Sequence, residues 1–220
     1  MERIQLGVHE LDQIMLGGVP KGSIILVIGP PGAGKSILSK LFLYKGALNN
    51  EVPLLLSTLE EQETIKETFK LFNWAQHVEE KLVLIDCYSW RAGKPRTELS
   101  ASLSSLTEVS LAISEALGRL REKGKARFVL DSFSDFVKYA GVDKSIRFLD
   151  SARMKLREKG VSGMVLMEEG MHAPRTVTSV EYSTDGTIRM RFAENGRYMM
   201  VSRMVATPVM PRWIPFVIGK

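Results

Sequence analysis

The chain has 220 residues, with 30 Lys and Arg against 25 Asp and Glu, a formal net charge of +5. Its 45% hydrophobic and 25% charged residues are typical of a globular protein and argue against disorder. The length predicts one domain over residues 1–220. A single cysteine, Cys87, excludes an intramolecular disulfide framework, and three scattered histidines give no zinc-ligand spacing.

The charge is distributed unevenly along the chain. Residues 1–110 hold 11 basic and 13 acidic side chains, whereas residues 111–220 hold 19 basic and 12 acidic ones. The positive second half is compatible with a polyanionic partner and equally with a solvated basic surface. No apolar run is long enough for a transmembrane helix, and the first residues lack the apolar core of a signal peptide. We therefore expect a cytoplasmic protein with no membrane span.

Short apolar runs alternate with helical periods through most of the chain. Strands are expected at residues 23–28, 52–57, 81–86, 127–131 and 162–167. Helices are expected at residues 35–48, 61–72, 106–120 and 146–156. This alternation predicts an α/β fold with a mostly parallel central sheet and helices on both faces. From Thr176 on, we expect extended segments joined at Asp185-Gly186 and Asn195-Gly196, because these dipeptides suit hairpin turns, so antiparallel hairpins extend the sheet.

The most specific motif is the segment of residues 29–36, which fits G-x-x-x-x-G-K-[S/T] between a strand and a helix. Its glycines let backbone amides converge on an anion, and the following helix adds the positive end of its dipole. Lys35 can reach the β- and γ-phosphates of ATP, and the Ser36 hydroxyl is placed to bind Mg²⁺. The predicted nucleotide-binding residues are Gly29, Pro30, Pro31, Gly32, Ala33, Gly34, Lys35, Ser36 and Ile37.

Acidic residues follow the neighbouring apolar strands. Asp131 ends the strand at 127–131 and is the preferred candidate to hold Mg²⁺ with Ser36, and Asp86 is the competing candidate. Glu60 and Glu61 follow the strand at 52–57, where a ligand at the carboxyl edge of the sheet would meet them. They are therefore candidates to orient the attacking water, or alternatively acids that complement a helix dipole.

These residues together resemble the RecA-like P-loop ATPases of the KaiC and RadA type. Residues 7–12 and 16–22 look like the lead-in to the phosphate loop of that family, and residues 180–186 resemble its C-terminal hairpin. Residues 201–205 and 214–218 are similar to the last strands of KaiC domains. The resemblance implies a RecA-like fold, with Glu60 and Glu61 as the catalytic glutamate pair.

The resemblance also implies roles for further residues. Asp131-Ser132 is similar to the family's Walker B end, and Lys35 belongs to the catalytic set. Arg203 stands in the basic stretch that reaches the nucleotide of a neighbouring KaiC subunit, so it is a candidate arginine finger acting in trans, or else an exposed strand residue. Val205 replaces the second basic residue of that stretch, which argues for slow hydrolysis. Glu168 lies at the junction that senses nucleotide state in the family.

The leading interpretation is an ATP-binding, Mg²⁺-dependent ATPase that couples ATP binding or hydrolysis to assembly. The resemblance implies a homo-oligomer, for instance a hexamer, with nucleotide at subunit interfaces. An alternative is a RadA-paralogue accessory of DNA recombination and repair with weak ATPase activity and single-stranded DNA or a recombinase as partner. The second-half charge and the segments 88–96 and 135–147, interpreted as loops, motivate it. Another alternative is a nucleotide-switched scaffold without significant hydrolysis.

Overall fold

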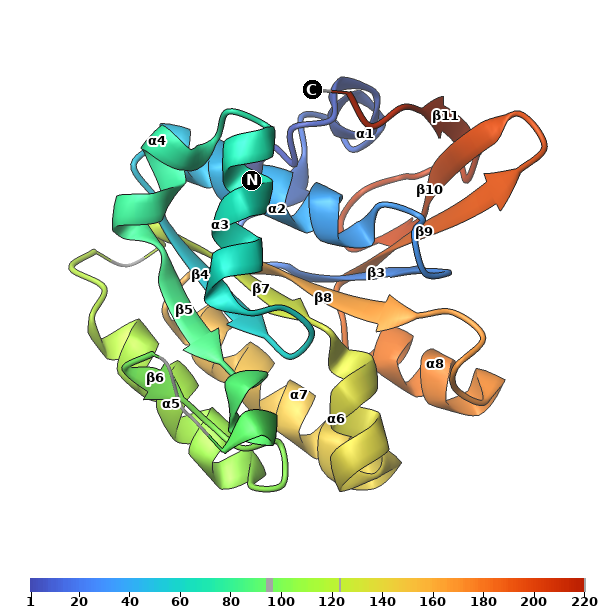
Figure 1. The fold of residues 1–220 in the computed structure, drawn as a ribbon. Helices are drawn as coiled ribbons and strands as arrows, with labels where there is room; N and C mark the ends of the chain where they lie inside the picture. The colour runs from blue at the N-terminus through green and yellow to red at the C-terminus, as the bar shows by residue number, and fades with distance from the viewer. Residues whose placement is uncertain (94–96, 123, 220) are drawn as a thin grey trace.

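A mixed β-sheet lies between two layers of helices (Figure 1) in the computed structural model, which describes residues 1–93, 97–122 and 124–219. Within these residues the main sheet has nine strands in the order β11-β10-β9-β3-β8-β7-β4-β5-β6. Their bounds are Ile24–Gly29 (β3), Val52–Ser57 (β4), Val83–Asp86 (β5), Leu99–Ser100 (β6), Ala126–Asp131 (β7), Ser162–Glu168 (β8), Gly186–Ala193 (β9), Gly196–Met204 (β10) and Ile214–Phe216 (β11). A small antiparallel pair joins β1 (Arg3–Ile4) to β2 (Val19–Pro20).

Helices cover both faces of the sheet because its central strands are apolar on both sides. Successive strand side chains point to opposite faces, so Ile25 and Val27 enter one core cluster while Leu26 and Ile28 enter the other. The first cluster lies under α1 (His9–Ile14), α2 (Lys35–Leu48), α3 (Gln62–Leu71) and α4 (Ala75–Val78). The second lies under α5 (Leu106–Gly118), α6 (Phe133–Ala140), α7 (Val142–Glu158) and α8 (Pro174–Tyr182). None of the helices in the described residues is long and apolar enough to cross a membrane.

The expected α/β architecture is confirmed. Strands β3 to β8 pair in parallel through the centre, and β9 also runs parallel to β3. Strand β10 pairs antiparallel with both β9 and β11, which forms the expected C-terminal extension. Asn195-Gly196 does connect a hairpin, between β9 and β10, with Gly196 at φ +126°.

The C-terminal part of the chain contains a helix that the sequence interpretation missed. Residues 174–182 form α8, with Pro174 at its start, where extended chain was expected from Thr176. The prediction rested on the turn dipeptides that follow, but Thr176 and Val180 are about one helical turn apart and both are buried. Asp185-Gly186 is not a hairpin turn, because β9 starts there and runs parallel to β3. The Asp185 carboxylate instead accepts a hydrogen bond of 2.9 Å from the Ile24 amide.

The two segments that were interpreted as loops also differ from that expectation. Residues 135–147 belong to α6 and the start of α7, which are separated at Gly141 with φ +83°. In the stretch 88–96, Ser89–Ala92 form a short 3₁₀ helix, and residues 94–96 lie outside the described part of the chain. Another 3₁₀ helix, at Glu79–Lys81, lies before β5. The methionines at 190, 199 and 204 are buried in the core beneath α1 and α2.

Candidate nucleotide-binding site

The loop between β3 and α2 has the backbone conformation of a phosphate-binding turn. Gly32 at φ +76° and Gly34 at φ +103° adopt left-handed conformations that residues with a Cβ disfavour. α2 then begins at Lys35, so its unpaired amides and positive dipole end point toward the loop. The turn therefore provides several backbone donors around one position at the carboxyl edge of the sheet.

The Lys35 side chain is folded over its own loop. It is 5% exposed, and its Nζ donates to the carbonyls of Gly29 and Pro30, each at 2.9 Å. The same ammonium forms an ion pair of 2.8 Å with Oε2 of Glu168, which ends the neighbouring strand β8. The lysine that is suited to bind phosphate is thus already paired with a carboxylate.

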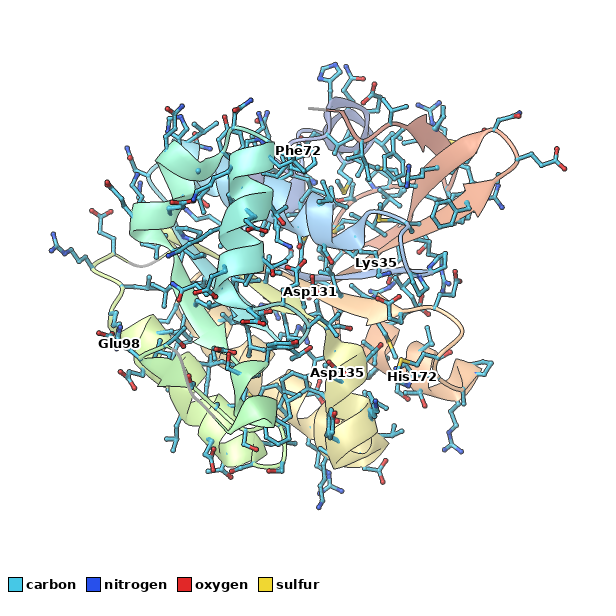
Figure 2. All side chains as sticks on the ribbon, viewed as in Figure 1. Lys35, Phe72, Glu98, Asp131, Asp135 and His172 are labelled. Carbon is cyan, nitrogen blue, oxygen red and sulfur yellow. The ribbon has the colours of Figure 1, made fainter. Side chains whose placement is uncertain are left out.

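Asp131 ends β7, close to the start of α2. Figure 2 shows Lys35 and Asp131 near each other in the centre of the molecule. Burial raises the pKa of Asp131, and a hydrogen bond from Ser36 and the charges of Lys40 and Lys35 oppose that shift. The structure therefore brings together Ser36 and Asp131, the two residues expected to share a metal ion.

This pair of donors fits Mg²⁺. Hydroxyl and carboxylate oxygens are the ligands that Mg²⁺ prefers, and a buried carboxylate gains from a nearby cation. Among the residues that the structure describes, no group of three or more His, Cys, Asp or Glu side chains could hold a metal. Mg²⁺ usually takes most of its ligands from substrate phosphates and water, so a site with two protein donors is compatible with this ion.

Asp86, the competing candidate, has a different environment at the end of β5. Its Oδ1 accepts hydrogen bonds of 2.9 Å from the amides of Tyr88 and Ser89, so the side chain stabilises the turn after the strand. Strand β5 lies two positions beyond β7 in the sheet, farther from β3. The geometry favours Asp131 over Asp86 as the partner of Ser36.

Glu60 and Glu61 lie between β4 and α3, at the same edge of the sheet. The Ser57 hydroxyl fixes this turn, since it donates to the Glu60 carbonyl at 2.8 Å and accepts from the Glu60 amide at 3.2 Å. Glu61 is the N-cap residue of α3, which agrees with the dipole interpretation for this residue. The Glu60 carboxylate forms an ion pair of 2.5 Å with Lys40 of α2.

Arg203 lies far from the phosphate loop of its own chain. It pairs with Thr187 of β9, which pairs with Leu26 in β3, several residues before the loop begins. Its guanidinium donates to the Thr184 carbonyl at 2.7 Å and to the Glu181 carbonyl, both at the C-terminal end of α8. Within one chain, Arg203 therefore stabilises the end of a helix.

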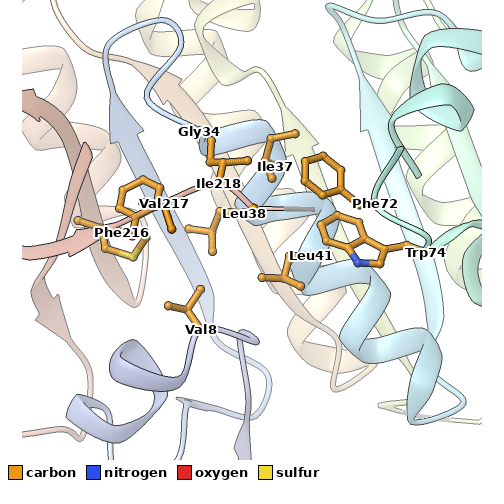
Figure 3. A pocket seen from close by; sticks show the side chains of 12 residues that line it. Val8, Gly34, Ile37, Leu38, Leu41, Phe72, Trp74, Phe216, Val217 and Ile218 are labelled. Carbon is orange, nitrogen blue, oxygen red and sulfur yellow. The ribbon is translucent and has the colours of Figure 1, made fainter. Parts of the chain in front are cut away.

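An apolar cavity of about 120 Å³ lies beside the first turns of α2 (Figure 3). Ile37, Leu38 and Leu41 of α2 form one wall, and Phe72 and Trp74, which follow α3, lie beside them. The two aromatic rings stack with centroids 4.7 Å apart. The C-terminal segment at 216–219 closes the opposite side.

Sequence reasoning missed Lys40 and the aromatic cavity. Lys40 lies four residues after Ser36 on the same helical face, and this spacing was the available signal. Sequence reasoning also missed Arg197 of β10, which donates to the Gly32 carbonyl at 3.3 Å, because this contact depends on a strand pairing that no local pattern specifies.

The fold and the loop define a P-loop nucleotide-binding protein of the RecA-like class. A family model described as "ATPase: KaiC" matches residues 4–220, so the chain belongs to the KaiC-like ATPase family. A UPF0273 protein of Pyrobaculum aerophilum is 30% identical over 202 residues, which cover 87% of this chain and 69% of the relative. A UPF0273 protein of Thermotoga maritima is 27% identical and covers 98% of this chain and 92% of its own length. The crystal structure of a KaiC-like protein from Pyrococcus horikoshii OT3 has the same fold, with a TM-score of 0.80 at 22% identity over 99% of this chain and 96% of that one.

Proposed function

We propose that the protein binds ATP together with Mg²⁺ and hydrolyses it. The observation that carries this proposal is the convergence of Lys35, Ser36 and Asp131 at one carboxyl edge of the sheet. The amides of residues 29–37 and the Lys35 ammonium hold the phosphates, and Ser36 and Asp131 hold the metal. When bound, Mg²⁺ neutralises charge on the β- and γ-phosphates.

The hydrolytic step is assigned to the turn between β4 and α3. Glu60 and Glu61 orient a water molecule whose oxygen attacks the γ-phosphorus, the bond to the bridging oxygen breaks, and ADP and phosphate are released. Lys35 leaves Glu168 and donates to the phosphates instead. The adenine base occupies the apolar cavity beside Trp74, where an aromatic ring offers a stacking surface.

The test is ATP binding and turnover by the wild-type chain and by two sets of variants. We expect Lys35→Ala to abolish measurable binding, and the double variant Glu60→Gln/Glu61→Gln to retain binding but lose turnover. Lys45→Ala is a matched control, because Lys45 lies in the last turn of the same helix. Undiminished turnover in both test variants would falsify the assignment.

We further propose that the active form is a homo-oligomer in which Arg203 of one subunit serves the nucleotide of the next. The position of Arg203, at the opposite end of β9 from its own phosphate loop, supports a role between subunits. The test is complementation between two inactive variants. A mixture of Lys35→Ala and Arg203→Ala chains should regain activity, since some interfaces then combine an intact loop with an intact arginine. A mixture as inactive as its components contradicts the role in trans.

A further inference from the structure

Lys40 is a buried lysine that neither the phosphates nor the metal requires. Its side chain is 2% exposed, deeper than that of Lys35. Removing an ammonium from water is costly unless a carboxylate compensates its charge, so a lysine at this depth needs a specific partner. The identity of that partner indicates what Lys40 does.

The partner is Glu60, one of the two carboxylates proposed to orient water. Nζ of Lys40 lies 2.5 Å from Oε2 of Glu60, whose side chain is 29% exposed. The positive charge of Lys40 also acts on Asp131, where it lowers a pKa that burial raises. Lys40 is therefore situated between acidic groups at the carboxyl ends of β4 and β7.

Two fixed points hold this carboxylate. The backbone of Glu60 is bound by the Ser57 hydroxyl, and its side chain is bound by an ammonium from a rigid helix. The ion pair through Oε2 restrains the position of the Glu60 carboxylate relative to α2. Such positioning matters because a displacement of about 1 Å in a reacting group can reduce a rate by about 100-fold.

We propose that Lys40 is a positioning residue of the hydrolytic site, which holds the Glu60 carboxylate in the orientation that directs water at the γ-phosphate. This inference rests on the proposed ATPase function and adds a residue to it. The direct contact of Lys40 is with Glu60, and its charge also acts on Asp131.

The structure indicates which substitution tests this role. Glu60→Gln leaves the buried Lys40 ammonium without its counter-charge, whereas Lys40→Met removes the buried charge and leaves a partly exposed carboxylate that water can reach. Lys40→Met is therefore the less disruptive of the two changes, and Lys40→Arg keeps the positive charge with a different shape. Lys45→Met, one turn further along α2, is the matched control.

The experiment measures kcat, KM and the affinity for MgATP, with the melting temperature of nucleotide-free protein as a check on folding. We expect Lys40→Met to lower kcat about 10- to 100-fold with KM and MgATP affinity within about twofold, and Lys40→Arg to recover part of the loss. In a Glu60→Gln background, Lys40→Met should cost little more, because both changes remove the same interaction.

Three results would overturn the inference. The first is an unchanged kcat in well-folded Lys40→Met protein, and the second is a change confined to KM. The third is a double variant whose loss of kcat equals the product of the losses from Lys40→Met and Glu60→Gln alone. Wild-type protein that binds MgATP but never turns it over would remove both the proposed hydrolysis and this role. Active wild type with an equally active Lys40→Met variant would remove only the role of Lys40.

Discussion

The ion pair between Lys35 and Glu168 must break before Lys35 can bind phosphate, so Glu168 competes with the nucleotide. The two groups are 2.8 Å apart, and their side chains are 5% and 22% exposed. Glu168→Gln keeps the size of the side chain and removes its charge. Lys35 retains the carbonyls of Gly29 and Pro30 in the variant, so the loop should keep its shape.

The size of the effect follows from the interaction that the nucleotide no longer has to displace. A hydrogen bond to a charged group contributes about 1.5–3 kcal/mol. Glu168→Gln should therefore tighten MgATP binding about 10- to 100-fold, as measured by calorimetry. Without nucleotide, the variant should be less stable to denaturant by about 1.5–3 kcal/mol, because the same interaction is lost from the folded state.

A neighbouring residue provides the control. Glu169 is adjacent in sequence but more exposed, and its partner Arg189 lies 3.7 Å away. Glu169→Gln should leave the affinity within about twofold. An affinity of Glu168→Gln equal to or weaker than that of wild type would refute the idea that this carboxylate competes for Lys35.

Two further predictions concern the metal and the base. Because burial raises the folded-state pKa of Asp131 above its unfolded value, its contribution to stability is present at acid pH and is lost as pH rises through the folded pKa. Asp131→Asn should therefore raise the stability of nucleotide-free protein by about 1 kcal/mol at pH 7, and the gain should shrink toward acid pH. In the same variant, Mg²⁺ should no longer strengthen ATP binding. A variant that is less stable than wild type in thermal melts at pH 7 would contradict this prediction. Trp74→Ala should weaken ATP binding by about 1 kcal/mol in calorimetry but leave inorganic tripolyphosphate binding unchanged, and equal losses for both ligands would exclude a base-stacking role.

The central strands and α2 could be predicted because each depends on local sequence. Residues 52–56 form an apolar run that ends at Ser57, and the structure places β4 at Val52–Ser57. Helix α8 was missed because the prediction relied on the turn dipeptides that follow it. Thr176 and Val180 favour strands in isolation, and both side chains are buried in the helix. Propensity yields to tertiary packing in such a segment.

The site could be predicted only as far as its motif extends. The phosphate loop and the acidic residues at the strand ends could be predicted because each lies at the end of a strand or directly after it in the sequence. The pairing of Lys35 with Glu168 joins residues 133 positions apart, and that of Lys40 with Glu60 depends on how α2 crosses the sheet. Such contacts are set by strand order, in which β8 lies beside β3, and no local pattern reports that order.

The two lysines of the site differ in how readily they can change partners. Lys35 has carbonyl acceptors as well as Glu168, so it can exchange a carboxylate for a phosphate without losing every bond. Lys40 is more deeply buried, and Glu60 is the acceptor at 2.5 Å. Exchange of that partner would leave a buried charge uncompensated, which is much more costly than the exchange at Lys35. Burial thus separates the lysine that responds to nucleotide from the lysine that keeps the hydrolytic carboxylate in place.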